Sequence, residues 1–157
     1  MRVGIGYDIH PLKEGRPLIL GGIKIPSPKG LDGHSDADCL THALCDALLG
    51  ALGKGDLGSH FPDTDPRYKG ISSLLLLEEV VEMARREGWE VENVDATIVA
   101  QGPRLAPYLS QMEERIARTL RVEPGKVNVK ATSPEALGAL GREEGIGALA
   151  VVLLRRG

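Results

Sequence analysis

Hydrophobic residues recur along the chain with two periods, and each period predicts one kind of element. Every second position is apolar at Val3, Ile5 and Tyr7, as in a half-buried strand. Leu44 and Leu48 lie four positions apart, as on the buried face of a helix. Strands are predicted on this basis over residues 2–7, 91–101, 127–131 and 148–154, with a hairpin over 18–26. Helices are predicted over residues 36–52, 72–87 and 107–120, with a short helix or turn over 134–140.

Alternating strands and helices predict an α/β protein, built as an α+β two-layer sandwich with helices on one face of a mixed sheet. We expect one domain over residues 1–157, since neither a repeat nor a linker-like segment interrupts the pattern. Ser35 or Asp36 is suited to begin the first helix, and Gly53 is suited to end it. The last strand is apolar along its whole length, which predicts burial on both faces, including burial against another subunit.

Charge and composition narrow the function. Lys and Arg number 19 and Asp and Glu number 22, so the net charge is -3, whereas proteins that bind nucleic acids or anionic membranes need a dominant basic field. Aromatic residues make up 3% of the chain, too few for a base-stacking platform. No apolar run reaches the roughly 20 residues of a membrane span, and the first residues resemble neither a signal nor a transit peptide. Cys39 and Cys45 would lie about 9 Å apart along a helix, too far for a disulfide, which favours reduced thiols and a cytoplasmic protein.

Three separated residues could share a metal ion. Asp8 and His10 lie two positions apart on a strand, so both side chains point to the same side, although an Asp-x-His triplet is also common on ordinary surfaces. His42 and Asp46 lie one helical turn apart, and Asp46 could orient the ring of His42; a solvated polar face is the alternative. Two histidines and one carboxylate would leave one position of a zinc ion open, as in catalytic zinc sites.

Two further segments carry side chains suited to a phosphorylated substrate. The acidic loop 56–66 could accept hydrogen bonds from hydroxyl groups, or be an ordinary turn-rich loop. Residues 130–135 could bind phosphate oxygens and a hard cation such as Mg2+, or cap a helix. His34 precedes a predicted helix, where free N–H groups favour phosphate. His60 has no evident partner and is interpreted as a surface residue.

These motifs occur in one order over essentially the whole chain. They are Gly6–His10, His34–Asp38, His42–Ala51, Phe61–Pro66, Val127–Thr132 and Gly141–Ile146. The set resembles the 2-C-methyl-D-erythritol 2,4-cyclodiphosphate synthase family. The resemblance implies an enzyme, a phosphorus–oxygen lyase of the non-mevalonate isoprenoid pathway. Its reaction would convert 4-diphosphocytidyl-2-C-methyl-D-erythritol 2-phosphate to the 2,4-cyclodiphosphate with release of CMP.

The resemblance also implies two metal ions and an assembly. Asp8, His10 and His42 would bind one Zn2+ per site, and Glu135 would hold one Mg2+ or Mn2+. The family forms a homotrimer in which the sheets pack around the threefold axis. Each active site would then combine the zinc-binding half of one chain with the nucleotide-binding half of its neighbour.

The remaining candidate residues take their roles from the same resemblance. His34 and Ser133 would stabilise the transition state, and Asp46 would position His42. Further substrate contacts are expected at Ile9, Ser35, Asp56, Leu57, Gly58, Phe61, Pro62, Asp63, Thr64, Asp65, Thr132, Pro134, Ala139 and Arg142. The cytosine pocket is expected largely from the main chain of Ala100, Gln101, Gly102, Pro103, Arg104, Leu105 and Ala106.

Some positions depart from the family pattern, and two other functions stay open. Ser133-Pro134 replaces a Thr-Thr or Thr-Asn pair, Arg104 stands where Lys is frequent, and Ala139 stands where some members carry a bulky apolar residue. Arg142 matches an arginine at the mouth of an apolar axial cavity, which implies an isoprenoid diphosphate as a further ligand. The alternatives are a zinc-dependent hydrolase or phosphatase acting on a nucleotide, and a non-catalytic trimeric isoprenoid-binding protein.

Overall fold

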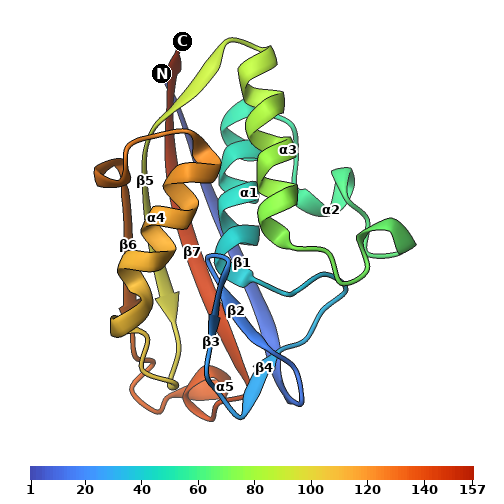
Figure 1. Cartoon of the computed structure of the whole chain (residues 1–157), viewed down its shortest axis with the longest axis vertical. Helices are drawn as coiled ribbons and strands as arrows, with labels where there is room; N and C mark the ends of the chain where they lie inside the picture. The colour runs from blue at the N-terminus through green and yellow to red at the C-terminus, as the bar shows by residue number, and fades with distance from the viewer.

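The chain folds into two layers, a mixed sheet and a set of helices that cover one of its faces (Figure 1). A computed structural model describes all residues from Met1 to Gly157. The sheet contains β1 (Arg2–Glu14), β4 (Lys29–Leu31), β5 (Trp89–Val99), β6 (Val127–Thr132) and β7 (Gly145–Arg156), in the order β4-β1-β7-β5-β6. Only the β5–β6 pair is parallel. The predicted fold class is therefore confirmed.

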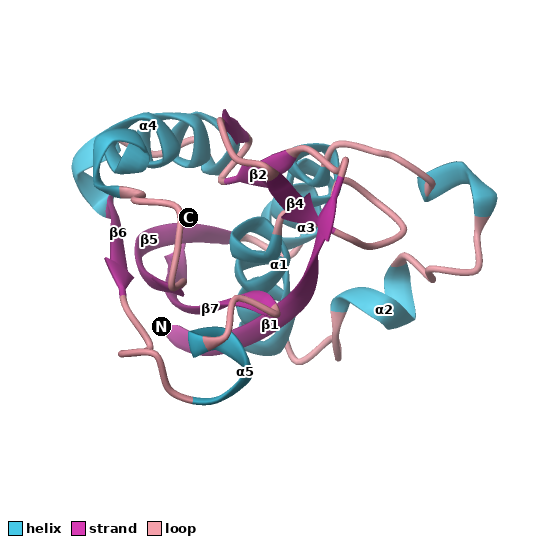
Figure 2. Ribbon diagram, turned by 90° about the horizontal axis from the view of Figure 1, so that it is seen from below, coloured by secondary structure: helices cyan, strands magenta, loops and turns pink.

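Three long helices form the second layer, and shorter elements connect the two. The long helices are α1 (Cys39–Leu52), α3 (Ser73–Arg86) and α4 (Leu109–Leu120). Figure 2 shows all three on the same side of the curved sheet. The shorter elements are the hairpin β2 (Leu18–Leu20) and β3 (Ile23–Ile25), the helices α2 (Leu57–His60) and α5 (Gly138–Gly141), and the 3-10 turns η1 (Pro66–Tyr68), η2 (Ala106–Tyr108) and η3 (Pro124–Lys126). No helix is both long enough and apolar enough to cross a membrane.

Helix α1 lies at the centre of the core, and two glycines of β1 let it approach the sheet. A Cβ atom on Gly6 would lie 1.8 Å from the carbonyl oxygen of Ala43, and one on Gly4 would lie 1.9 Å from that of Ala47. Real Cβ atoms do not come so close to a backbone oxygen, so only glycine fits at these two positions. This contact fixes the distance between β1 and α1, the two elements that carry the candidate metal ligands.

The first helix begins later than the sequence predicts. Asp38, and not Ser35 or Asp36, caps α1 and accepts a hydrogen bond from the Thr41 backbone N–H at 3.0 Å. The same buried carboxylate accepts the backbone N–H groups of Gly21 and Gly22 at 2.9 and 2.8 Å. Because the hairpin turn supplies these donors, a tertiary contact decides where the helix starts. The predicted end at Gly53 is confirmed.

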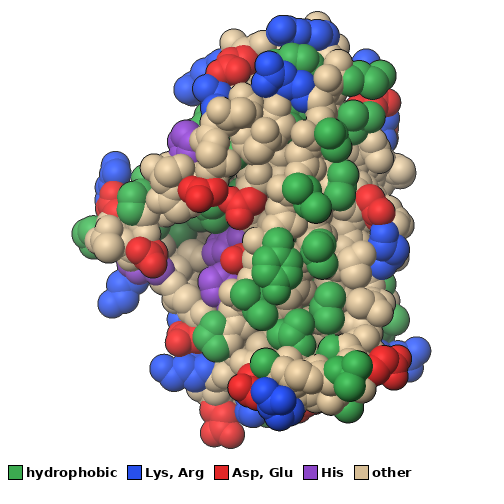
Figure 3. All heavy atoms as spheres, turned by 180° about the vertical axis from the view of Figure 1, so that it is seen from behind, with side chains coloured by type: hydrophobic (Ala, Val, Ile, Leu, Met, Phe, Trp, Pro, Cys, Tyr) green, Lys and Arg blue, Asp and Glu red, His purple; other side chains and the backbone are tan.

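The outer face of the sheet is apolar and uncovered in the single chain. On β7, the side chains of Ala148 and Val152 are buried against the helices, whereas Leu149 and Val151 on the other face are 38% and 42% exposed. The neighbouring strand β1 adds the exposed side chains of Val3, Ile5, Tyr7 and Ile9. Figure 3 shows these hydrophobic side chains running down the sheet. The single chain therefore buries one face of β7, and burial of the other face by another subunit stays a prediction.

Candidate active site

Three potential ligands meet between β1 and the first turns of α1. Asp8 and His10 alternate with outward-facing residues on β1, so both point toward the helical layer, where His42 projects from α1. Asp8 Oδ2 lies 2.8 Å from His10 Nε2 and 3.1 Å from His42 Nδ1, and the two ring nitrogens are 3.1 Å apart. The predicted clustering of these three side chains is confirmed. Figure 3 shows histidine side chains in a hollow beside the apolar face of the sheet.

This donor set fits a small divalent cation. Nitrogen and oxygen ligands about 2.0–2.2 Å from a tetrahedral zinc ion lie about 3.3 Å from one another, close to the separations found here. The carbonyl oxygen of Asp32 lies 3.1 Å from His10 Nδ1, and a carbonyl can only accept a hydrogen bond. The hydrogen of the neutral His10 ring is therefore assigned to Nδ1, which leaves a lone pair on Nε2 directed at Asp8 and His42.

The charges of the cluster depend on one another. Burial raises the pKa of Asp8, but hydrogen bonds and charges of His10 and His42 outweigh it and hold that pKa below its ordinary value. Burial lowers the pKa of His10, but the bond to Asp8 and its charge outweigh burial and raise that pKa. The Asp8 carboxylate therefore favours a proton on the His10 ring. A divalent cation would compete with that proton for the same lone pair.

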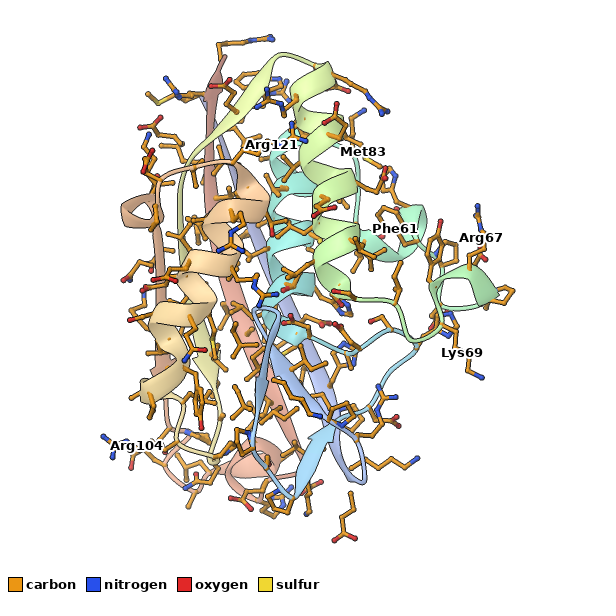
Figure 4. The ribbon with its side chains drawn as sticks, in the orientation of Figure 1. Phe61, Arg67, Lys69, Met83, Arg104 and Arg121 are labelled. Carbon is orange, nitrogen blue, oxygen red and sulfur yellow. The ribbon has the colours of Figure 1, made fainter.

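A cavity of about 570 Å³ opens onto the three ligands. Nine of the residues expected at the site from the sequence line it in addition to the ligands, namely His34, Ser35, Asp46, Asp56, Leu57, Gly58, Phe61, Pro62 and Asp63. Gly33, Tyr68 and Leu76 also line the cavity and were not predicted. Figure 4 shows Phe61 on the loop that projects beside α3 and forms one wall. The cavity wall is therefore partly acidic and partly apolar.

Three of the residues before Pro66 that were expected to contact substrate lie outside this cavity. Ile9 points from the opposite face of β1 and belongs to the exposed apolar face. The Asp65 carboxylate binds the Arg67 guanidinium at 2.7 Å, while its carbonyl oxygen lies 2.7 Å from His34 Nε2. Thr64 is not among the lining residues. The main chain of Asp65, and not its side chain, therefore contacts the candidate site.

The prediction that Asp46 orients His42 is wrong. Asp46 Oδ1 accepts the backbone N–H of Leu57 at 2.7 Å, so this carboxylate holds the start of α2. Burial raises the pKa of Asp46 above its ordinary value. The rear nitrogen of His42, Nε2, instead lies 2.8 Å from Ser73 Oγ and 3.1 Å from Ser35 Oγ.

Sequence reasoning missed Ser73. Ser72 and Ser73 together look like an ordinary helix start, and no local pattern distinguishes one from the other. Ser73 reaches His42 only because α3 packs against α1. The sequence offered one signal. The first position of α3 carries a serine, whereas the other positions on the face that packs against α1 are apolar.

A second group of candidate residues gathers where β5 and β6 end. These strands are parallel neighbours, so their carboxyl ends bring residues 100–106 beside 132–135. Ala100 N–H donates to Thr132 O at 3.1 Å, and Ala136 N–H donates to Gln101 Oε1 at 2.9 Å. The side chain of Leu105 is buried in the core, so only its main chain is available for a ligand.

The two groups are not brought together within one chain. None of residues 100–106 and 132–135 lines the cavity at the three ligands. Figure 4 shows Arg104 and Phe61 on opposite sides of the molecule. Ser133, Glu135, Ala139 and Arg142 lie around these exposed loops, and Arg142 pairs with Glu144 at 2.5 Å. The expected site is therefore split into two halves in the single chain.

Comparisons with known proteins show which family the chain belongs to. The chain matches the YgbB family over residues 1–155. A 2-C-methyl-D-erythritol 2,4-cyclodiphosphate synthase of Syntrophobacter fumaroxidans is 62% identical over 155 residues, which cover 99% of this chain and 98% of that protein. A solved structure of such a synthase in its CDP-bound form is 39% identical with a TM-score of 0.90, and the match covers 98% of this chain and 100% of that one. The bifunctional IspDF of Campylobacter jejuni matches 99% of this chain at 42% identity with a TM-score of 0.96, and this chain spans 42% of that longer protein. The chain therefore belongs to the YgbB family, whose compared members include 2-C-methyl-D-erythritol 2,4-cyclodiphosphate synthases.

Proposed function

We propose that the chain converts 4-diphosphocytidyl-2-C-methyl-D-erythritol 2-phosphate to 2-C-methyl-D-erythritol 2,4-cyclodiphosphate and CMP, as a step of the non-mevalonate isoprenoid pathway. The observation that carries the proposal is the meeting of Asp8, His10 and His42 at the floor of a cavity, in a chain that matches this family over almost its whole length. The site residues follow from their positions in that cavity and on the loops after β5 and β6.

The reaction is an intramolecular phosphoryl transfer. An oxygen of the 2-phosphate attacks the β-phosphorus, and the bond from that phosphorus to the oxygen bridging it to the α-phosphate breaks. CMP leaves with the bonding electron pair. The nucleophile is already an anion, so the protein needs no strong base and acts by positioning the groups and neutralising their charge.

The chain offers holding groups for two cations. Asp8, His10 and His42 would bind Zn2+, and Glu135 would bind Mg2+ or Mn2+ in the assembled site. When bound, these ions supply Lewis-acid neutralisation of the phosphate charge. Ser133 is suited to donate a hydrogen bond to the transferring phosphoryl group. The Nε2–H of His34 donates to the Asp65 carbonyl oxygen, so His34 would need a second hydrogen, on Nδ1, to donate to that group as well. Hydrogen bonds from substrate hydroxyls could be accepted by the carboxylates of Asp56 and Asp63 and by the main chain at Gly58.

The split site supports a homotrimer. The cavity at the three ligands lacks residues 100–106 and 132–135, and the exposed apolar face of β1 and β7 needs a cover. A second copy that covers this face would bring its own exposed loops toward the cavity. Arg142 is exposed beside these loops, which makes an isoprenoid diphosphate on the trimer axis a further candidate ligand. The free thiols of Cys39 and Cys45 support a cytoplasmic location.

Phosphorus NMR of the products tests the reaction. The purified protein, with Zn2+ and Mg2+ added, should convert the diphosphocytidyl substrate to CMP and a cyclic diphosphate. A chelator should stop turnover, and restored metal should restart it. Linear products without a cyclic diphosphate would overturn the proposal in favour of a nucleotide hydrolase. The His42→Ala variant should lose CMP release, while His60→Ala, a histidine outside the cavity, should keep it.

A further inference from the structure

We infer that Ser73, backed by Asp36, is a positioning residue that fixes the ring of His42 in the form that binds the metal. The inference rests on the proposed function in taking His42 as a ligand. It assigns a role to two residues that were not among the site residues expected from the sequence. Neither side chain touches the other two ligands, so each acts on the cluster only through His42.

A continuous chain of hydrogen bonds runs from Asp36 to His42. Ser73 Oγ bonds Asp36 Oδ1, and Ser73 N–H donates to Asp36 Oδ2 at 3.1 Å. The same hydroxyl oxygen lies 2.8 Å from His42 Nε2. Ser73 is fully buried and His42 is 8% exposed, so water cannot easily replace either partner. The chain links the loop before α1 to the first residue of α3.

The chemistry of Asp36 sets the direction of each hydrogen in this chain. An ionised carboxylate can only accept, so the Ser73 hydroxyl must donate its single hydrogen to Asp36. The lone pairs of Ser73 Oγ are then left to accept from His42 Nε2. A neutral imidazole carries one hydrogen, so a hydrogen on Nε2 leaves Nδ1 with a lone pair. Nδ1 is the nitrogen that faces Asp8 and His10.

Ser35 does not make this relay redundant. Its hydroxyl lies 3.1 Å from His42 Nε2, farther than that of Ser73, and already accepts the backbone N–H of Ala37 at 3.1 Å. No carboxylate accepts the hydrogen of Ser35, so this hydroxyl can turn to donate to Nε2. Loss of Ser73 would therefore allow the opposite tautomer, in which the hydrogen lies on Nδ1 and blocks the metal.

A purely structural role for Ser73 makes a different prediction. Ser73 is the first residue of α3, and its bonds to Asp36 tie this helix to the loop before α1. If that were its whole role, loss of the hydroxyl would lower folding stability without changing the His42 ring. The preceding residue provides a matched control. Ser72 is exposed, makes no side-chain cap bond, and can be replaced by Ala without touching the relay.

The test measures Co2+ affinity and the tautomer of His42 in the full-length protein at pH 8. Ser73→Ala should weaken Co2+ binding about 10–100-fold, as for other residues that orient a metal-bound histidine, whereas Ser72→Ala should bind like the wild type. In the metal-free protein, ¹⁵N shifts of His42 should report a hydrogen on Nε2 in the wild type and a mixture of tautomers in Ser73→Ala. Asp36→Ala should weaken Co2+ binding similarly. The double variant Asp36→Ala/Ser73→Ala should bind Co2+ as well as the single variant with the lower affinity, because both residues act through the same hydrogen-bond chain.

The outcomes separate this inference from the proposed function. If Ser73→Ala keeps wild-type Co2+ affinity and an unchanged His42 tautomer, while His42→Ala loses the metal, the relay is refuted and the metal site stands. If the wild type itself binds no Co2+ at His42, both proposals are refuted. Thermal unfolding of the metal-free variants identifies those that keep the fold. If Ser73→Ala unfolds, Ser73→Thr replaces it in the test, because this variant retains the hydroxyl and should keep the Co2+ affinity of the wild type.

Discussion

At the scale of single residues, the cluster works only if each side chain presents a lone pair to the same point. The Asp32 carbonyl fixes His10 from behind, and the carboxylate of Asp8 completes the group. Without a metal, the same geometry favours a proton, because the carboxylate raises the pKa of His10. Protons and metal ions therefore compete for one position.

Metal affinity should fall as the pH is lowered. Because the pKa of His10 is raised above its ordinary value of 6.5, its ring gains a proton at a higher pH than a free histidine does. Each proton displaced by the metal costs about one order of magnitude in affinity per pH unit below that pKa. Competition with a chelator between pH 8 and pH 6 measures the slope. An affinity that is flat over this range would contradict the assigned charge state.

Residue patterns predict this site unevenly. Asp8 and His10 could be paired from the sequence because strand geometry puts alternate residues on one side. Asp46 could not be assigned correctly. Its spacing of one helical turn predicts that its carboxylate lies near the His42 ring, but the spacing does not show which other donors that carboxylate can bind. The competitor is the Leu57 backbone N–H, which arrives from a loop whose path the sequence does not specify.

At the scale of elements, the approach of β1 to α1 sets the spacing between the ligands on these two elements. Hydrophobic periodicity predicted both elements, although α1 is buried on nearly all sides and only β1 alternates. It misplaced the start of α1 because Asp38 also serves the hairpin turn at Gly21. Local patterns therefore found the elements, whereas contacts between elements set their boundaries.

Gly6→Ala should destabilise the fold and weaken metal binding together. The new methyl group would meet the Ala43 carbonyl at 1.8 Å, so β1 must move away from α1 and carry Asp8 and His10 with it. Overpacking of this kind costs about 1–3 kcal/mol. Chemical denaturation measures the first effect and Co2+ titration measures the second. Gly125→Ala is the control, because nothing lies within 4 Å of its added Cβ; equal effects in both variants would exclude the packing argument.

At the scale of the whole molecule, the two halves of the candidate site lie on surfaces of the same chain that do not meet. The apolar last strand predicted a partner subunit, and the single chain leaves one face of that strand uncovered. Sequence pattern alone could not tell a strand buried by its own chain from one buried by a neighbour, because both are apolar on two sides. The structure separates the two cases by exposing Leu149 and Val151.

If the chain forms the proposed homotrimer, mixed trimers should recover activity from two inactive parents. His42→Ala removes the metal half and Glu135→Ala removes the other half, so each variant alone should be inactive. In an equal mixture that is unfolded and refolded together, head-to-tail trimers would rebuild about a quarter of the sites from intact halves. CMP release by the mixture measures this recovery. A mixture as inactive as its parents would show that each site is built from one chain.

The alternation of β1 has a consequence for how this protein can change through mutation. One side of the strand carries Asp8 and His10, and the other carries Ile5, Tyr7 and Ile9 of the outer surface. A single inserted or deleted residue before Asp8 would exchange the two sides, because strand side chains alternate with a period of two. Substitutions can therefore alter the metal-ligand side and the apolar outer side separately, but a change of length in this strand would disrupt both in one step.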